Sequence, residues 1–433
     1  MKMYTYPSKS AQKRISTIVN RELGFKKTEY TAVARILEDV KKNGDQAILK
    51  YADRFDSPGM TIDSLKVTRE EIDAASRQVD KDFLHALDNA VSRIRSFHLQ
   101  QQSKSWITTD ESGTILGQLV NPVDAAGIYV PGGRSGRTPL VSSVLMGAIP
   151  AQIAGVKRMV MVTPPTGQGM VNPCLLTAAA RVGIDEIYKI GSAWAIAALA
   201  YGTDTIDKVD VIAGPGNIYV TLAKKILAGR VGIDMIAGPS EILIIADKTA
   251  DPEFLAADLL SQAEHDPLAS AILVTDSISV ARAVHQALDR QIAELSRQDI
   301  ASESLKNFGA LIVVPDIATA VTISNKIAPE HLELQVDDPF AHIGKIRNAG
   351  ALFLGRYTPE AVGDYIAGPN HVLPTAGTAR FSSALSVSHF IKTTSLIHYS
   401  KAAFDRDARD IICLAKTEGL GAHANSIAIR TTE

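Results

Sequence analysis

The chain has 433 residues, of which 46% are hydrophobic and 21% are charged, the balance of a folded globular protein rather than a disordered one. Lysine and arginine total 45 against 47 acidic residues, and the net charge of −2 argues against a nucleic-acid binder, which needs a basic excess. No apolar run reaches the roughly eighteen residues that span a bilayer, so we expect neither nucleic acid nor a membrane as a partner.

The amino-terminal residues and the cysteine count indicate where the protein works. The opening, MKMYTYPSKSAQ, lacks the apolar core of a secretory signal. Two cysteines, Cys174 and Cys413, cannot build a disulfide framework. We therefore expect a cytoplasmic protein.

Helices are predicted over the first hundred residues. Residues 28–54 carry apolar side chains at helical spacing, with a break near Gly44. A second helix is predicted from Thr68, where Thr-x-x-Glu71 forms a capping box, to about Gln101.

From residue 115 onward, short β-branched runs alternate with helical segments. The predicted strands lie at 115–120, 127–130, 159–162, 187–190 and 209–213, then at 242–246, 271–275, 310–314 and 351–354. The predicted helices lie at 139–154, 173–182, 193–201, 217–228, 251–265, 277–296, 316–327 and 401–418. This rhythm is typical of parallel sheets with helices on their faces, and we interpret it as two α/β units that meet near residue 241.

One four-residue word, Ile-Ala-Gly-Pro, occurs three times, at 212–215, 236–239 and 366–369. Each copy can be a plain turn at a strand end, because Gly-Pro cannot continue a ladder. We favour the alternative that each turn presents the following residues to a ligand, since ligands bind beyond the carboxyl ends of strands in α/β sheets. The residues presented in this way include Asn217, Ser240 and His371.

Two pairs of polar residues could carry chemistry. Gln262 and His265 share one face at the end of a predicted helix and fit a metal site, although a helix-terminal histidine is also a simple cap. Glu330 and His331 stand side by side, and on a loop both could point into a cleft as two proton carriers. The alternative for the second pair is a chance arrangement on a solvated loop.

The turn-rich segment 363–375 contains Asp364 and His371, and such long segments inside compact domains are usually functional. Asp and His are also zinc ligands. Glu418 and His423 lie near the C-terminus, where a lone histidine is normally just exposed.

Nucleotide-binding signals are weak, because no Gly-x-Gly-x-x-Gly follows a strand. The loops 130–136 and 214–217 each connect a predicted strand to a predicted helix. Either could hold an anion at a helix N-terminus or be an ordinary tight turn.

Taken together, the words in this chain resemble the histidinol dehydrogenase family, and the resemblance runs from about residue 20 to the end. The matching words, in order, are Tyr129-Val-Pro-Gly-Gly, Gly214-Pro-Gly-Asn, Ala237-Gly-Pro-Ser-Glu, Ser261-Gln-Ala-Glu-His, Pro329-Glu-His-Leu, Asn370-His-Val-Leu-Pro-Thr and Glu418-Gly-Leu-x-Ala-His. Several motifs in the same order identify a family far more specifically than any single motif does.

The resemblance implies the last two steps of histidine biosynthesis, L-histidinol to L-histidinal to L-histidine, with two NAD⁺ and one zinc ion per subunit. It implies Glu330 and His331 as catalytic residues. The implied zinc ligands are Gln262, His265, Asp364 and His423. The implied substrate contacts are Ser240, Gln262, His265, Glu330, His331, Asp364, His371, Glu418 and His423. The implied cofactor contacts are Tyr129 and Asn217, with Trp194 at a third position.

The resemblance also implies two incomplete, doubly wound Rossmann-like units with small helical ends, in an intertwined homodimer. The implied segments are an N-terminal piece (1–26), a zinc and substrate domain (27–128 with 242–382), an NAD domain (129–241) and a tail (383–433). That tail docks on the partner subunit, so Glu418 and His423 complete the partner's site.

Two departures from the family pattern fall on the cofactor side. The family usually has Gly-Gly-Ala-Gln where this chain has Gly191-Ser-Ala-Trp194, and an indole offers only an N–H donor. Trp194 could instead stack on a ring or line the groove. The loop 133–139 is about three residues longer than in many relatives and adds Arg134 and Arg137, which either grip the pyrophosphate or are solvated.

Other functions fit parts of the same pattern. A dehydrogenase of another small alcohol, such as a sulfonated diol, would keep zinc, Glu330 and His331 but need Glu418 less, because Glu418 reads the imidazole of histidinol. A zinc hydrolase would use Glu330 to activate water. It would need no nucleotide-binding cleft, so the first α/β unit would have no function in it. A binding protein without catalysis would not need the metal ligands.

Overall fold

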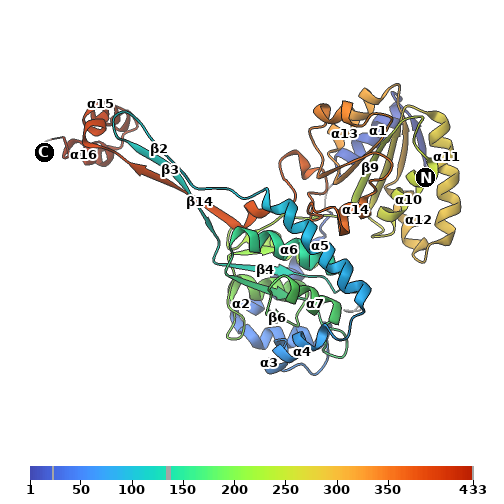
Figure 1. Ribbon diagram of the computed structural model, residues 1–433, viewed down its shortest axis with the longest axis horizontal. Coiled ribbons are helices and arrows are strands. Elements are labelled where there is room, and N and C mark those ends of the chain that lie inside the picture. The colour runs from blue at the N-terminus through green and yellow to red at the C-terminus, as the bar shows by residue number, and fades with distance from the viewer. Residues whose placement is uncertain (22–23, 133–137, 432–433) are drawn as a thin grey trace. The chain divides into compact units, whose positions relative to one another are not determined.

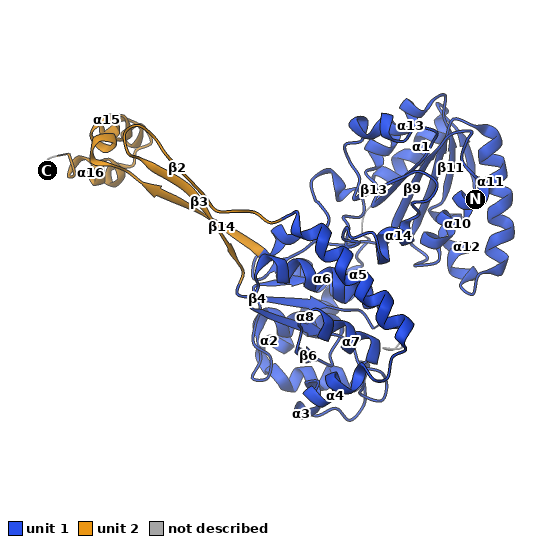
Figure 2. Cartoon of the chain, in the orientation of Figure 1, with its two compact units in different colours: residues 1–101, 124–390 blue, residues 102–123, 391–433 orange. Residues whose placement is uncertain are grey.

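The computed structural model describes residues 1–21, 24–132 and 138–431. The chain splits into two compact units, coloured separately in Figure 2. Unit 1 comprises residues 1–101 and 124–390, and unit 2 comprises residues 102–123 and 391–433. Among the described residues, no helix combines the length and the apolar character needed to cross a membrane. Arg134 and Arg137 of the predicted longer loop lie outside the described residues.

Unit 1 contains two parallel sheets, and the first has the strand order β6-β5-β4-β7-β8 (Figure 1). Its strands are β4 (Ala125–Tyr129), β5 (Arg158–Val162), β6 (Glu186–Tyr188), β7 (Val211–Ala213) and β8 (Gly232–Ile233). The helices of this part are α2 (Lys27–Phe55), α3 (Ile62–Leu65), α4 (Arg69–Ala75), α5 (Lys81–Leu99), α6 (Val141–Ala154), α7 (Pro173–Arg181), α8 (Ser192–Tyr201) and α9 (Ile218–Leu227). The central strand β4 is buried at every residue, as expected in a parallel sheet covered by helices.

The second parallel sheet has the order β1-β11-β10-β9-β12-β13. Its strands are β1 (Met3–Thr5), β9 (Glu241–Ala246), β10 (Ser270–Thr275), β11 (Ala310–Val313), β12 (His331–Gln335) and β13 (Ala351–Leu354). Its helices are α1 (Lys9–Val19), α10 (Pro252–Ala263), α11 (Ile278–Gln291), α12 (Gln298–Asn307), α13 (Ile317–Ile327) and α14 (Glu360–Tyr365), with 3₁₀ turns η2 (Ile292–Glu294), η3 (Phe340–Lys345), η4 (Thr378–Arg380) and η5 (Val387–Phe390).

The strands of the second sheet are unbroken apolar runs in the sequence because both faces of this sheet are buried. In β9, Ile242 and Ile244 belong to one core cluster, whereas Leu243 and Ile245 belong to another. Successive side chains of a strand point to opposite faces, so each face of this sheet buries half of the strand. A strand buried on both faces has no reason to alternate apolar with polar residues.

Unit 2 is small and antiparallel, with the strand order β14-β3-β2. Its elements are β2 (Trp106–Thr109), β3 (Ile115–Pro122), β14 (Ile391–His398), α15 (Lys401–Thr417) and α16 (Gly421–Ala428). It leaves large apolar side chains uncovered, among them Ile107, Ile397 and Leu414 at 61%, 71% and 67% exposure. Apolar surface gathered on so small a unit is the kind that an interface covers.

The two parallel sheets confirm the predicted α/β fold class. The predicted helix break is also confirmed, because Gly44 within α2 has φ 49° and ψ −128°. The single helix predicted from Thr68 to Gln101 is wrong: α4 and α5 are separate, because the Asp80 side chain accepts the N–H of Phe83 at 2.6 Å and starts a new helix. The predicted domain boundaries stay a prediction.

The three Ile-Ala-Gly-Pro words occupy different settings. The first overlaps the end of β7, the second lies between β8 and β9, and the third follows α14. The expectation that each marks the end of a strand is therefore wrong for the third copy. Local sequence alone does not distinguish a turn that leaves a strand from one that enters it.

Candidate active site

Glu330 and His331 lie where the chain enters β12, at the amino end of that strand. His331 pairs with Ile242 of β9, so the two strands begin at the same edge of the sheet. Both catalytic candidates are buried, with exposures of 6% and 3%. The pair is therefore not a chance arrangement on a solvated loop.

The backbone of Glu241, the first residue of β9, contacts both candidates. Its N–H donates to Glu330 Oε2 at 2.8 Å, and its carbonyl oxygen lies 3.0 Å from His331 Nδ1. A carbonyl oxygen can only accept, so Nδ1 carries the hydrogen and Nε2 keeps its lone pair. Burial lowers the pKa of His331, which keeps the ring neutral. The geometry thus leaves Nε2, a buried atom without a hydrogen-bond partner, as a base.

Nε2 of His331 lies near two carboxylates, the buried Glu360 and the half-buried Asp364. It lies 3.6 Å from Glu360 Oε1, and ligand atoms of His331, Glu360 and Asp364 all fall within 4.8 Å of one another. Gln262, at 0% exposure near the end of α10, contacts the same Glu360. The structure therefore brings two predicted zinc ligands, Gln262 and Asp364, to the predicted catalytic histidine.

The buried carboxyl groups make this edge a place for a cation. Burial, together with the nearby Asp258, raises the pKa of Glu360 to about 8. Burial and Glu360 raise the pKa of Asp364 to about 7 against the opposing effect of His331, and burial also raises that of Glu330. Carboxylates in such surroundings are costly unless a positive charge accompanies them. Their donor set, together with imidazole and amide, fits a zinc ion.

The remaining predicted residues are placed less closely. Ser240 directly precedes β9, and His265, exposed in the single chain, lies two residues after the last residue of α10. The buried Nε2 of His371 has no hydrogen-bond partner, and burial lowers the pKa of this ring to about 4. Glu418 and His423 are exposed residues of unit 2.

The predicted cofactor residues lie at the carboxyl ends of the first sheet. Tyr129 ends β4, and its hydroxyl accepts the N–H of Ser192 at the start of α8. Asn217 follows β7 and caps α9, accepting two backbone N–H groups at 3.0 and 3.2 Å. This cap uses the amide oxygen and leaves the amide nitrogen to donate to a ligand.

The turn between β7 and α9 is held from both sides. Gly214 has φ +122°, and a Cβ there would lie 2.1 Å from the Tyr129 carbonyl oxygen, so only glycine fits. The Gly214 N–H donates to the Asp234 side chain at 2.8 Å, and Lys224 Nζ donates to the carbonyl oxygen of Gly214 at 2.9 Å. Lys224 and Asp234 also form a buried ion pair with each other. The turn carrying Asn217 is thus fixed against Tyr129.

Trp194 lies inside the first α/β part, at 5% exposure on α8. Its indole N–H donates to Asp56 Oδ2 at 2.9 Å, and its ring stacks on Tyr51 and Phe55 with centroids 5.8 and 5.5 Å apart. Asp56 also accepts the N–H of Gly191 at 3.2 Å. The one N–H of the Trp194 side chain is therefore directed to Asp56, and the contact of Trp194 with a cofactor stays a prediction.

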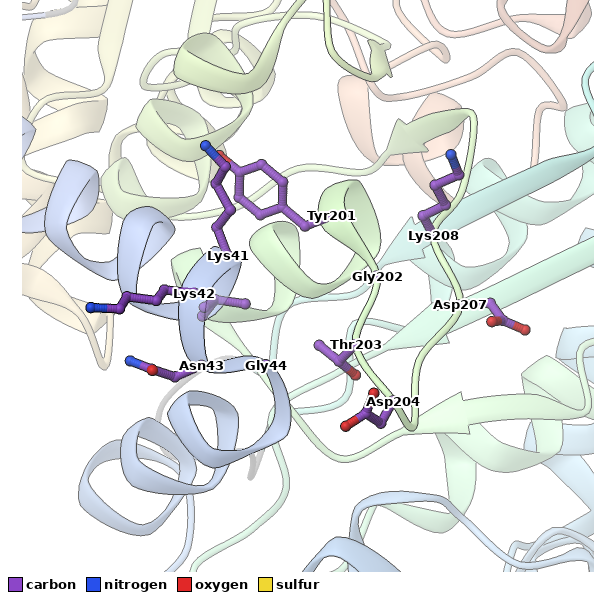
Figure 3. A pocket seen from close by; sticks show the side chains of 11 residues that line it. Lys41, Lys42, Asn43, Gly44, Tyr201, Gly202, Thr203, Asp204, Asp207 and Lys208 are labelled. Atoms are coloured by element: carbon purple, nitrogen blue, oxygen red, sulfur yellow. The ribbon is translucent and has the colours of Figure 1, made fainter.

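A cavity of about 580 Å³ lies elsewhere on the first α/β part (Figure 3). It is lined by residues around Gly44 of α2 and by the segment Tyr201–Lys208, between the end of α8 and β7. This is the amino edge of the first sheet, opposite to the edge that carries Tyr129 and Asn217. The cavity is therefore separate from the predicted cofactor residues.

Sequence reasoning missed three residues of the buried carboxylate group and the role of Glu241. Glu333 is a charged residue in the otherwise apolar buried strand β12, which is itself a signal. Glu360 stands four residues before Asp364 and so shares its helix face, a spacing that could have been noticed. Asp258 likewise stands four residues before Gln262 on α10. The part played by Glu241 had no signal, because it uses only backbone atoms.

A family model described as histidinol dehydrogenase matches residues 20–431. The chain belongs to the histidinol dehydrogenase family. It is 56% identical over 424 residues to histidinol dehydrogenase of Desulfotalea psychrophila, covering 98% of each chain. It is 53% identical over 398 residues to that of Carboxydothermus hydrogenoformans, covering 92% of this chain and 93% of the relative. The crystal structure of histidinol dehydrogenase from Elizabethkingia anophelis is similar with a TM-score of 0.93 and 38% identity, covering 100% of this chain and 98% of that chain.

Proposed function

We propose that the protein is a zinc-dependent, NAD-dependent oxidoreductase that converts L-histidinol through L-histidinal to L-histidine, the last two steps of histidine biosynthesis. The observation that carries the proposal is the neutral, buried His331, whose Nε2 has no hydrogen-bond partner and which lies beside Gln262, Glu360 and Asp364. Membership of the histidinol dehydrogenase family supports the choice of substrate. A cytoplasmic location belongs to the same proposal.

In this proposal one zinc ion per subunit is held by Gln262, His265, Asp364 and, from a second copy of the chain, His423. Bound zinc supplies a fixed template for the substrate amine and imidazole, and bound NAD⁺ supplies the hydride acceptor. Ser240 and His371 contact the substrate. The buried carboxyl groups around His331 support a cation at this position.

His331 carries the proton transfers of both oxidations. Nε2 takes the hydroxyl proton of histidinol while the carbinol carbon gives up a hydride. Glu330 helps a water molecule add to the aldehyde, since its Oε2 is held by the Glu241 N–H and its other oxygen is left to accept from water. Once it has released the first proton to solvent, His331 accepts a proton from the resulting diol as the second hydride is transferred to a second NAD⁺. Glu418 pairs with a nitrogen of the substrate imidazole.

On the cofactor side, we propose that Tyr129, Asn217 and Trp194 contact NAD⁺. The free N–H of the Asn217 amide and the hydroxyl hydrogen of Tyr129 are both donors at strand carboxyl ends. Two helices begin at this edge, and helix N-termini favour phosphate groups.

We also propose that two chains form an intertwined homodimer in which each tail (383–433) completes the partner's site. Glu418 and His423 are exposed in the single chain, and unit 2 leaves large apolar side chains uncovered. The division into an N-terminal piece (1–26), a zinc and substrate domain (27–128 with 242–382) and an NAD domain (129–241) stays a prediction from the resemblance. It differs from the packing of the single chain, in which α2 shares a core with the first sheet and β1 pairs with β11 of the second.

The activity is tested by incubating the zinc-loaded protein with L-histidinol and NAD⁺. The expected result is two NADH and one L-histidine per histidinol consumed. Turnover of a sulfonated diol but not of histidinol would favour the related dehydrogenase. Hydrolysis without NADH would overturn the oxidoreductase assignment.

The shared site is tested by co-expressing two inactive variants, His331→Ala and His423→Ala, so that mixed dimers form. If tails are exchanged, each mixed dimer has one intact site, and random pairing restores about a quarter of wild-type activity. If His423 serves its own chain, every site in the mixed dimer is damaged and no activity returns. His423→Ala alone should lose its zinc, and retention of full zinc and activity would contradict the tail assignment.

A further inference from the structure

The side-chain amide of Gln262 is clamped by a carboxylate that does not belong to the proposed zinc ligands. In the amide orientation that the Glu360 carboxylate requires, the nitrogen lies 3.0 Å from both Oε1 and Oε2 of Glu360. The same nitrogen lies 3.1 Å from Nδ1 of His331, which already donates to the Glu241 carbonyl oxygen, so Glu360 is the acceptor for the amide. Both residues are buried, at 0% and 4% exposure. A carboxylate accepts only from the nitrogen end of an amide, so the carbonyl oxygen is turned to the opposite end.

Glu360 is itself held in place. Its backbone N–H donates to Glu333 Oε1 at 3.1 Å, and Gln335 donates to Glu333 Oε2 at 3.3 Å. Glu333 stands two residues after His331 and therefore on the same face of β12. One strand thus carries the catalytic base and the side chain that supports the clamp.

The contact with Glu360 compensates for the fact that an amide can turn either of its two ends to the proposed zinc ion. An amide is a neutral ligand, and only its oxygen coordinates a metal. Rotating the amide by half a turn would present N–H groups to the cation instead. A carboxylate on the nitrogen forbids that rotation and makes the oxygen more electron-rich, as outer partners of metal ligands do.

We propose that Glu360 is a positioning residue that holds the Gln262 amide with its oxygen facing the zinc ion and is not itself a ligand. The inference rests on the proposed zinc site. The competing arrangement is direct coordination by His331, Glu360 and Asp364, whose ligand atoms lie within 4.8 Å of one another. That arrangement would occupy the Nε2 lone pair of His331 and remove the base, so the clamp is favoured.

The test measures zinc affinity of the full-length protein by competition with a chelator. Glu360→Gln removes the charge at constant size and should weaken zinc by about 10- to 100-fold. The matched control is Glu253→Gln, the same substitution at an exposed carboxylate of α10 whose side chain contacts Arg290 and Gln291 and not the clamp. It should stay within about threefold of wild type, well short of that loss.

A double-mutant cycle separates the clamp from direct coordination. Gln262→Ala removes the amide, so adding Glu360→Gln should cause no further loss if Glu360 acts only through Gln262. A further loss of tenfold or more in the double variant would make Glu360 a ligand and overturn the proposal. Unchanged zinc affinity of Glu360→Gln alone would also overturn it.

The wild-type protein gives an answer that does not depend on how the variants fold. In a zinc-bound crystal structure the Gln262 oxygen should lie about 2.0–2.2 Å from the metal, with both Glu360 oxygens outside that range. A Glu360 oxygen at ligating distance would overturn this inference alone. A wild-type protein that binds no zinc would overturn the proposed function as well.

Discussion

The two parallel sheets place their candidate functional residues at opposite edges. Tyr129 and Asn217 follow the carboxyl ends of β4 and β7 in the first sheet. Glu241 and His331 begin β9 and β12, so they lie at the amino edge of the second sheet. Under the proposed function, the rule that ligands bind beyond strand carboxyl ends describes the first sheet but not the second.

The difference follows from which helix ends meet each edge. In these α/β parts a helix starts near the carboxyl edge and ends near the amino edge, and its N-terminus carries partial positive charge. The first edge thus presents the starts of α8 and α9, which suit phosphate, with neutral side chains beside them. The second edge presents the end of α10 and buried carboxyl groups, which suit a cation.

The largest expected effect is at the amino edge of the second sheet. His331→Asn keeps an N–H that can reach the Glu241 carbonyl but has no base, so kcat should fall by about 10²- to 10⁴-fold. Zinc content should stay at the wild-type value, because His331 is not a proposed ligand. Steady-state kinetics and metal analysis measure both, with the exposed His85→Ala as control. A kcat within tenfold of wild type would break the assignment of chemistry to this edge.

At the carboxyl edge of the first sheet, the next largest effect of a substitution should be on the free energy of unfolding. Asp234→Ala leaves Lys224 as an unpaired buried charge and frees the Gly214 N–H, which should cost about 3–5 kcal/mol of unfolding free energy. Removing both charges in Lys224→Met/Asp234→Leu should cost less. Denaturant unfolding measures both variants. Equal stability of Asp234→Ala and the wild type would show that the ion pair does not hold this turn.

A smaller effect concerns pH and Asp56 in the first α/β part. Burial raises the pKa of Asp56 from 3.8 to about 6. Between those values the folded protein binds more protons at this site than the unfolded chain does, so its contribution to stability falls as pH rises from about 4 to about 6. Asp56→Asn cannot titrate, and its melting temperature should change less across this window. Exposed Asp63→Asn serves as control, and identical pH profiles for Asp56→Asn and wild type would contradict the expectation.

The smallest effect sharpens the cofactor assignment. Trp194→Phe keeps a ring on Tyr51 and Phe55 but loses the N–H to Asp56, which should raise the KM for NAD⁺ about fivefold, the loss of about 1 kcal/mol. The KM for histidinol should stay within about twofold, because the substrate residues belong to the other sheet. Initial-rate kinetics decide the matter. A change in the KM for histidinol alone would contradict the proposal that Trp194 contributes to NAD⁺ binding.

Much of the architecture was predictable from local sequence. The apolar run at 242–246 matches β9, and the break at Gly44 lies where predicted. Five strands were missed: β1, β2 and β8 have four residues or fewer, and β12 and β14 contain polar residues. The helices α12 and α16 were missed as short segments between turns. Propensity is weak in such pieces, and tertiary packing decides their structure.

The sequence by itself determined the α/β fold class, the family, and the identity of Glu330, His331, Gln262 and Asp364 as candidates, because periodicity and ordered words are local properties of a chain. Only the tertiary structure decided that β12 lies beside β9, and hence that one backbone residue, Glu241, orients both Glu330 and His331. It alone also brought Glu360 to Gln262 and set the two groups of residues at opposite sheet edges. Strand order and helix direction depend on contacts between distant segments, which no local spacing encodes.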